Sequence, residues 1–149
     1  MSLDRESELA LAADNPAAAD FLAGRGGALH PPIETDPGAW WAEMHPAADL
    51  AETYYARIAW SRYPTSPPSV KFAHAVGASL VDPTAWPLIP GYRPGSLDIC
   101  KPFTAEGFGL HPDWANTNQA WSGTGNPFLA VIRELQRNLN SSSYQGRHR

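Results

Sequence analysis

The segment Tyr63-Pro64-Thr65-Ser66-Pro67-Pro68 constrains the fold more than any other part of the chain. Proline has no main-chain N–H group, so the three prolines cannot donate to the hydrogen-bond ladder of a sheet. The segment must therefore connect two regular elements instead of forming one. An aromatic residue before proline favours the cis form, and we expect a cis peptide bond between Tyr63 and Pro64.

Alternating apolar residues on both sides of this segment predict β-strands. One strand covers Tyr54 to Trp60, and the other covers Ser69 to Val76. The Trp-rich stretch from Ile33 to Ala48, interrupted by Pro37-Gly38 and His45-Pro46, predicts one or two further strands with turns. The inward-facing side chains of the two strands are expected to be Tyr54, Ala56, Ile58, Trp60, Val70 and Phe72, with Val76 as a further candidate.

Helices are predicted on both sides of the strand region. Residues 2–23 are rich in Ala and Leu, and Asp14-Asn15-Pro16 divides them into two short helices, the second one capped by Asn15. Pro127 to Leu139 is the clearest helix, with Asn126 as its cap. Its apolar face combines Phe128, Val131, Ile132, Leu135 and Leu139 at helical spacing.

The order of these elements predicts one α+β domain over residues 1–149, built on an antiparallel meander of about four strands. We expect a helical segment over residues 1–30 and a flexible polar tail over 141–149. Residues 77–98 are too apolar for a free linker and should pack on the sheet. Residues 101–124 should form a long irregular loop after Cys100.

Composition and charge exclude several classes of protein. The formal net charge of −4 argues against a nucleic-acid surface, which needs clustered Lys and Arg. No apolar run approaches the length of a membrane span, so no membrane partner is expected. The N-terminal sequence lacks the layout of a secretory signal, and a single Cys cannot form an internal disulfide. These features predict a cytoplasmic protein.

Several short motifs occur in the order found in ubiquitin-conjugating enzymes. Tyr63-Pro64-Thr65-Ser66-Pro67-Pro68 is followed by Val70-Lys71-Phe72, then by Ile99-Cys100, and then by Trp121-Ser122 ahead of the last helix. In this order the chain resembles the ubiquitin-conjugating (UBC-like) family over roughly residues 54–139, as a divergent, bacterial-type member. In that resemblance Tyr63, Pro64, Pro67, Pro68 and Trp121 form the structural motif.

The resemblance implies an activity and a set of partners. Cys100 stands where the family keeps the cysteine that carries a ubiquitin-like modifier as a thioester and passes it to an amine. The partners implied are the ubiquitin-like protein, its activating enzyme and a protein substrate, without a cofactor. The chain departs from the family in three ways: no Asn lies between Pro64 and Cys100, the spacer from Cys100 to Trp121 is longer, and the family's last two helices are absent.

Thioester chemistry at Cys100 needs helpers, and the sequence offers several candidates. Aminolysis requires a donor to the developing oxyanion and a group that deprotonates the attacking amine. Asp98 and Asp113 are candidate bases or orienting groups, and each could equally be a turn residue. His111 is a candidate partner that would lower the pKa of the thiol, or it could fix the turn before Pro112. The candidate oxyanion donors are a backbone N–H, Ser96, Asn116 and Asn118.

Two other functions fit the same residues. A free Cys is often an inert buried residue, so the chain could be a catalytically inactive UBC-like interaction module. A Cys/His hydrolase unrelated to conjugation would need His111 and a carboxylate aligned with an exposed Cys100. A metal site is not expected, because the five His residues include no i,i+4 or His-x-His pair and Cys100 has no partner Cys.

Overall fold

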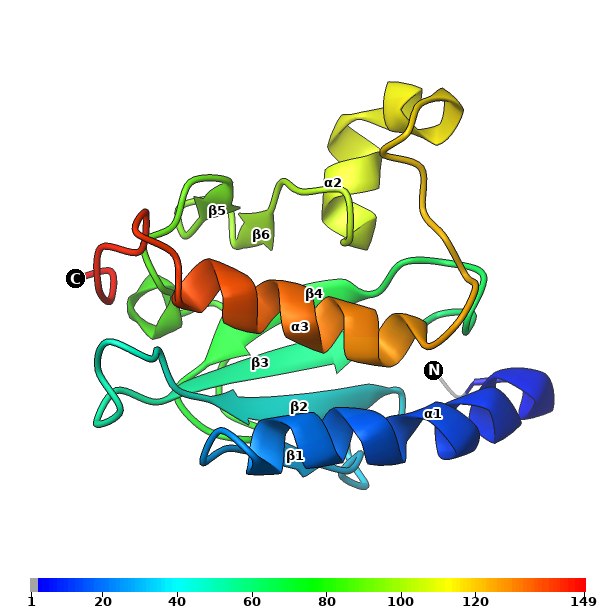
Figure 1. Cartoon of the computed structure of the whole chain (residues 1–149), viewed down its shortest axis with the longest axis horizontal. Helices are drawn as coiled ribbons and strands as arrows, with labels where there is room; N and C mark the ends of the chain where they lie inside the picture. The colour runs from blue at the N-terminus through cyan, green and yellow to red at the C-terminus, as the bar shows by residue number, and fades with distance from the viewer. Residues whose placement is uncertain (1–2) are drawn as a thin grey trace.

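The computed structural model describes residues 3–149, which form an α+β fold with an N-terminal helix, a four-stranded antiparallel sheet and a C-terminal helix (Figure 1). The strand order β1-β2-β3-β4 follows the sequence, which confirms the predicted meander. Both long helices lie on one side of the sheet in Figure 1, and the segment after β4 continues above them. The elements are α1 (Arg5–Ala23), β1 (Ala28–His30), β2 (Ala39–Met44), β3 (Tyr54–Ala59), β4 (Ser69–Ala73), η1 (Pro83–Ala85), β5 (Tyr92–Arg93), β6 (Asp98–Ile99), α2 (Ala105–Leu110), η2 (Pro112–Asn116) and α3 (Pro127–Leu139).

The sheet buries the side chains that alternation predicted. Six of the seven candidates for the inward face, all but Val76, are at most 3% exposed. Val76 is only partly buried, because β4 ends at Ala73 and does not reach the predicted limit. In the register of β3 and β4, Ala56 lies opposite Phe72 and Ile58 lies opposite Val70, so apolar pairs meet on the same face. This face carries the hydrophobic core, and α1 and α3 cover it.

Helix α1 differs from the prediction of two short helices, because it continues through Pro16 without a break. Pro16 has no N–H group for the carbonyl of Ala12. The side-chain amide of Asn15 lies 3.5 Å from that oxygen and also donates to the carbonyl of Leu11 at 3.0 Å. Asn15 therefore acts inside the helix and not as a cap, and apolar burial continues past Pro16 at Ala18.

The predicted helical segment over residues 1–30 is also shorter than expected, because α1 ends at Ala23 and residues 28–30 form strand β1. Gly26 has a φ of 78°, in the left-handed region that favours glycine. A Cβ atom on Gly27 would lie 2.1 Å from the carbonyl oxygen of Glu43. The glycine turn thus lets the chain pass close to β2 and pair with it, which apolar periodicity could not predict.

Helix α3 has the predicted limits and cap. The Asn126 side chain accepts a hydrogen bond from the N–H of Leu129 at 3.0 Å, and its amide donates to the carbonyl of Asp14 at 3.0 Å. The cap therefore also joins α3 to α1. The five residues of the predicted apolar face are all at most 1% exposed: Phe128, Val131, Ile132, Leu135 and Leu139.

The proline segment and the chain after β4 are packed as predicted. The peptide bond between Tyr63 and Pro64 is cis. Trp121 Nε1 donates to the carbonyl of Pro64 at 3.0 Å, so two parts of the family-like motif touch. In residues 77–98, Trp86 and Tyr92 are both buried against the core.

Two predictions of irregular structure were wrong. Residues 101–124 contain α2 and η2, which form an arm that projects from the body in Figure 1. Residues 141–149, predicted to be a flexible tail, are bound to the body. The N–H of Leu88 donates to the carbonyl of Gly146 at 2.8 Å, and the N–H of His148 donates to the carbonyl of Trp86 at 2.9 Å. None of the helices in residues 3–149 is long and apolar enough to cross a membrane.

Candidate functional site

Cys100 follows directly after a small β-hairpin that packs on helix α3. Strands β5 and β6 pair antiparallel, with Tyr92 opposite Ile99, and both of these side chains are buried. The Tyr92 hydroxyl donates to Asn138 Oδ1 of α3 at 2.8 Å. Because successive side chains of an extended segment point to opposite sides, burial of Ile99 directs Cys100 outward. Its side chain is accordingly partly exposed.

Main-chain contacts hold Cys100 in place. Its N–H donates to the carbonyl of Gly91 at 2.7 Å across the hairpin. Gly91 has a φ of 88°, and a Cβ atom there would lie 3.3 Å from the carbonyl oxygen of Cys100. Glycine therefore permits the close approach of the two segments.

The turn of the hairpin is fixed by two charged contacts. Leu97 has a φ of 59°, unusual for a branched side chain, and its carbonyl accepts a hydrogen bond from Lys71 Nζ at 2.6 Å. Arg93 donates to both oxygens of Asp98, at 2.7 and 2.8 Å. This hydrogen bonding raises the pKa of Arg93 above its ordinary value. These contacts therefore restrain the backbone of the hairpin that precedes Cys100.

Two of the candidate helpers lie in this hairpin. The Asp98 carboxylate is occupied by Arg93, so it is not available as a base without breaking that ion pair. Ser96 is exposed in the turn, where its N–H donates to the carbonyl of Arg93 at 3.1 Å. Within residues 3–149, no hydrogen bond joins Cys100 Sγ to either side chain.

The other candidates lie in the arm or just after it. The ring of His111 stacks on Trp114, with centroids 4.4 Å apart and planes 21° apart. Asp113 is exposed in η2, and Asn116 and Asn118 are exposed near its end. No hydrogen bond within residues 3–149 connects His111 to Cys100. The hydrogen bond between Cys100 and His111 that would directly support a Cys/His hydrolase is therefore not among those of residues 3–149.

The root of the arm is attached to the cysteine hairpin by Thr104. Its hydroxyl donates to the carbonyl of Ile99 at 2.6 Å and accepts from the N–H of Gly107 at 2.9 Å, which caps α2. Thr104 is fully buried. Sequence reasoning missed this residue, although a Thr directly before a short helical pattern is a cap signal.

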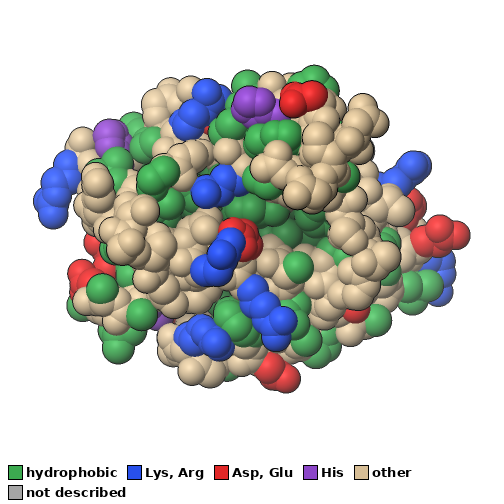
Figure 2. Space-filling view, turned by 45° about the horizontal axis from the view of Figure 1, so that its top comes forward, with side chains coloured by type: hydrophobic (Ala, Val, Ile, Leu, Met, Phe, Trp, Pro, Cys, Tyr) green, Lys and Arg blue, Asp and Glu red, His purple; other side chains and the backbone are tan. Residues whose placement is uncertain are grey.

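A groove lies between residues 101–103, residues 120–122 and helix α3; Lys101, the residue after Cys100, lines it. It encloses about 410 Å³, and a smaller cavity of about 220 Å³ shares its charged residues Lys101, Glu134 and Arg137. Phe103, Trp121 and Val131 belong to its apolar lining. Figure 2 shows this face, with a hollow lined by hydrophobic side chains near its centre and charged side chains at the edge. The sequence analysis did not single out Lys101, although it directly follows Cys100.

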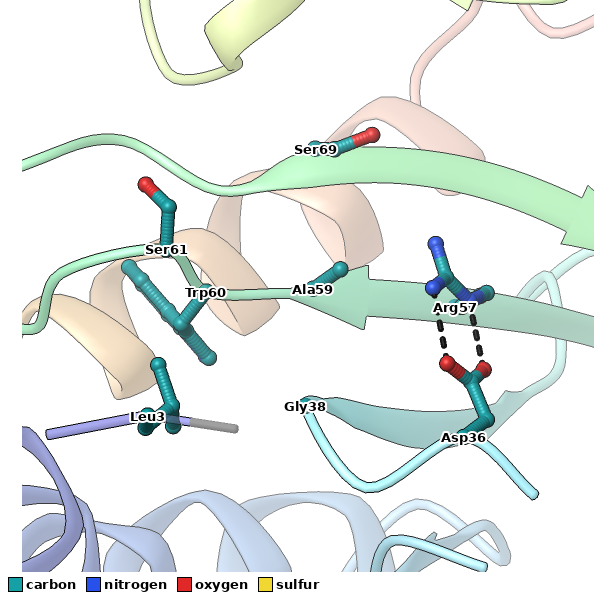
Figure 3. A pocket seen from close by; sticks show the side chains of 8 residues that line it. All are labelled: Leu3, Asp36, Gly38, Arg57, Ala59, Trp60, Ser61 and Ser69. Carbon is teal, nitrogen blue, oxygen red and sulfur yellow. Dashed lines mark hydrogen bonds and ion pairs between the residues drawn. The ribbon is translucent and has the colours of Figure 1, made fainter. Parts of the chain in front are cut away.

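A second cavity lies where β3 and β4 meet the start of the chain (Figure 3). It encloses about 230 Å³ and contains the ion pair of Arg57 with Asp36, whose two hydrogen bonds measure 2.7 and 2.9 Å. These bonds lower the pKa of Asp36. The charges of this cavity therefore satisfy each other, and no predicted site residue lines it.

The chain was compared with protein-family models, curated proteins and solved structures. No protein-family model, curated protein or solved structure matches the chain. Among residues 3–149, no group of three or more His, Cys, Asp and Glu side chains is arranged to hold a metal ion. The candidate site therefore consists of Cys100, its hairpin and the adjoining groove.

Proposed function

We propose that this chain is a UBC-like protein that carries a ubiquitin-like modifier as a thioester on Cys100 and transfers it to an amine. The observation that supports this most is the placement of Cys100, which is partly exposed at the end of a hairpin and directly precedes Lys101, a residue that lines an open groove. The order of helix, four-stranded meander, cysteine segment and helix agrees with the UBC-like resemblance.

The proposed chemistry divides one acyl transfer into two steps. The Cys100 thiolate attacks the activated carbonyl of the modifier, and the activating thiol leaves as the new C–S bond forms. An amine then attacks the thioester carbonyl and forms a C–N bond, its nitrogen releases a proton to solvent, and the C–S bond breaks with its electron pair on Sγ, which regenerates the Cys100 thiolate. A fixed backbone aids both steps, because a thiol held in position loses less freedom on reaching the transition state.

A second function, a catalytically inactive UBC-like module, is favoured by one observation. The Asp98 carboxylate is bound to Arg93, and His111 is stacked on Trp114 instead of contacting the thiol. With these groups engaged, no acid or base assists Cys100. In that case the groove and the arm would bind partner proteins, and Cys100 would have no catalytic role.

The two functions are separated by the reactivity of Cys100 toward an activated acyl group. The probe is a peptide ending in Gly-Gly, supplied as its thioester with 2-mercaptoethanesulfonate, and intact mass measures the adduct. The proposal predicts a dithiothreitol-sensitive adduct that forms faster on the folded chain than on the chain unfolded in urea. Cys100→Ala should abolish this adduct, and Ser96→Ala serves as the control in the same hairpin.

The same experiment can contradict the proposal. Acylation of Cys100 no faster in the folded than in the unfolded chain would favour the inactive module. An adduct that survives Cys100→Ala would show that the acyl group is attached to an amine or a hydroxyl, since the sequence holds one cysteine.

A further inference from the structure

A cavity where the two long helices end differs in charge from the other cavities of the molecule. Figure 1 shows that α1 and α3 run side by side in the same direction, and the cavity lies between the turn after α1, the end of α3 and the loop of residues 45–53. It encloses about 350 Å³. Four other cavities within residues 3–149 each have a carboxylate in their lining, from Asp36, Glu43 or Glu134. This one has Arg25 and His45 and no carboxylate, which favours an anionic ligand.

Two arginines lie near the same aromatic ring at this end of the helices. The guanidinium carbon of Arg25 lies 3.6 Å from the ring centroid of Phe21, and that of Arg133 lies 5.8 Å from it. Both arginine side chains are exposed, and neither has an ion-pair partner within residues 3–149. The two carboxylates of the loop, Asp49 and Glu52, do not line the cavity. Like charges near one ring repel each other, and a carboxylate bound near both would relieve this repulsion.

Hydrogen-bond donors remain available around the cavity. Within residues 3–149 the Arg25 guanidinium makes one hydrogen bond, from Nη1 to the carbonyl of Phe21 at 3.0 Å, so most of its N–H groups are left for a ligand. Asn140 Oδ1 accepts from the N–H of Ala47 at 2.8 Å and from Gln136 Nε2 at 3.0 Å. These two bonds fix the orientation of the Asn140 amide, whose Nδ2 carries further donors. The donors around the cavity therefore suit a carboxylate.

The surroundings of these donors favour a peptide over a small anion. Leu50 lines the cavity and is 69% exposed, and covering it with an apolar side chain of a partner would be favourable. A Cβ atom on Gly26 would have no atom within 4 Å beyond its chain neighbours, so the turn after α1 leaves room for a peptide backbone. The cavity thus combines a basic part with an exposed apolar part.

We propose that this cavity and the two arginines form a docking site for an acidic peptide segment of a partner protein, in which carboxylates adjoin apolar side chains. Arg25 and Arg133 bind a carboxylate of the segment, and Asn140 donates a further hydrogen bond. An apolar side chain of the segment packs on Leu50. The site shares no residue with the cysteine hairpin or with the groove beside Lys101, so the inference does not rest on the proposed function.

The test measures the binding of the full chain to a fluorescein-labelled peptide, Ser-Glu-Glu-Leu-Glu-Glu-Leu, by fluorescence anisotropy. A second peptide with Gln in place of each Glu should bind at least about tenfold more weakly. The double variant Arg25→Gln, Arg133→Gln should weaken binding of the acidic peptide by about tenfold. Leu50→Ser should weaken it by a smaller factor, about threefold. Added salt should weaken it in the native chain.

A matched control and a second variant keep the result clear. Arg5→Gln removes an exposed arginine at the opposite end of α1 and should leave the affinity unchanged. Arg25 also bonds to the carbonyl of Phe21, so Arg25→Gln could lower Tm. Arg133 makes no hydrogen bond or ion pair within residues 3–149, and Arg133→Gln alone should reduce binding by about threefold at an unchanged Tm.

Several results would overturn the docking site. They include no detectable binding of the acidic peptide, equal binding of the Gln peptide, or full affinity in the Arg25→Gln, Arg133→Gln double variant. Free glutamate that binds as tightly as the peptide would show a site for a small carboxylate instead. Single-stranded oligothymidylate that binds more tightly than the peptide, with binding lost in the same double variant, would show a nucleic-acid site instead.

Discussion

The segment 141–149 and residues 105–120, which contain the arm, were both predicted to be irregular, yet they are attached to the body in different ways. The last segment binds residues far away in the sequence: its backbone pairs with residues 86–88, and Tyr144 bonds with Tyr54 across 90 positions. The arm is held mainly by its own neighbours, such as Phe108, His111 and Trp114. Local composition alone therefore does not reveal how firmly a segment is attached.

Arg147 adds side-chain contacts to the backbone attachment of segment 141–149. Its Nη2 donates to Glu52 Oε1 and to the carbonyl of Thr53, both at 2.6 Å, and its Nη1 donates to the carbonyl of Thr84 at 3.2 Å. The guanidinium carbon also lies 4.5 Å from the ring centroid of Tyr54. A planar group with five N–H donors can satisfy three acceptors at once, which a lysine could not do in the same geometry.

The arm has fewer connections to the body, and they lie at its two ends. Thr104 and Glu106 fix its first end, the latter by accepting a hydrogen bond from the N–H of Val70 at 3.3 Å. Trp121, just after the arm, fixes its second end through Pro64. Between these points the aromatic stack keeps the arm ordered without contact to the thiol.

Of the substitutions considered in the two regions, Arg147→Ala is expected to lower stability the most. Loss of the ion pair and of two carbonyl contacts should lower the free energy of unfolding by about 2–3 kcal/mol. For a chain of this size this corresponds to a fall in Tm of about 6–10 °C, measured by calorimetry. Arg147→Lys should recover part of the loss. A change in Tm of less than about 1 °C would mean that the segment contributes little to stability.

Acidification should weaken the same segment by a smaller amount, because it neutralises only one of the Arg147 partners. Hydrogen bonding from Arg147 lowers the pKa of Glu52 below its ordinary value. A carboxylate with a lowered folded-state pKa stabilises the fold above its unfolded pKa, and this contribution is lost as the pH falls through the folded pKa. The Tm difference between the native chain and Arg147→Ala should therefore shrink as the pH falls below about 4. A difference that stays constant would contradict the role of Glu52.

The smallest effect is expected on the arm, from His111→Ala. The stacked, solvent-accessible ring should contribute less than about 1 kcal/mol to stability. Because His111 stacks on Trp114 and no hydrogen bond within residues 3–149 joins it to Cys100, the pH dependence of Cys100 alkylation by iodoacetamide should be unchanged. A shifted pH midpoint or a slower reaction would show that His111 does act on the thiol.

The sequence predicted the parts of the fold that depend on near neighbours. Helix α3 and strand β3 were predicted because their apolar spacing and, for α3, the Asn126 cap are local signals. The attachment of Arg147 was not predictable, since its partners lie 63 to 95 positions away. The ion pair of Asp98 with Arg93 joins residues five positions apart, so it could be predicted from the sequence. The position of His111 relative to Cys100 depends on how the arm folds, which local sequence does not determine.

The contact between the first and last long helices has a consequence for the order of folding. The hydrogen bond from Asn126 to Asp14 joins positions 112 residues apart, whereas the strands pair with sequence neighbours. Closing so long a loop has an entropic cost that hairpins avoid. We therefore expect the meander to form early in the folding reaction and the docking of α3 on α1 to complete it. Substitutions at the α1–α3 contact should then accelerate unfolding more than they slow refolding.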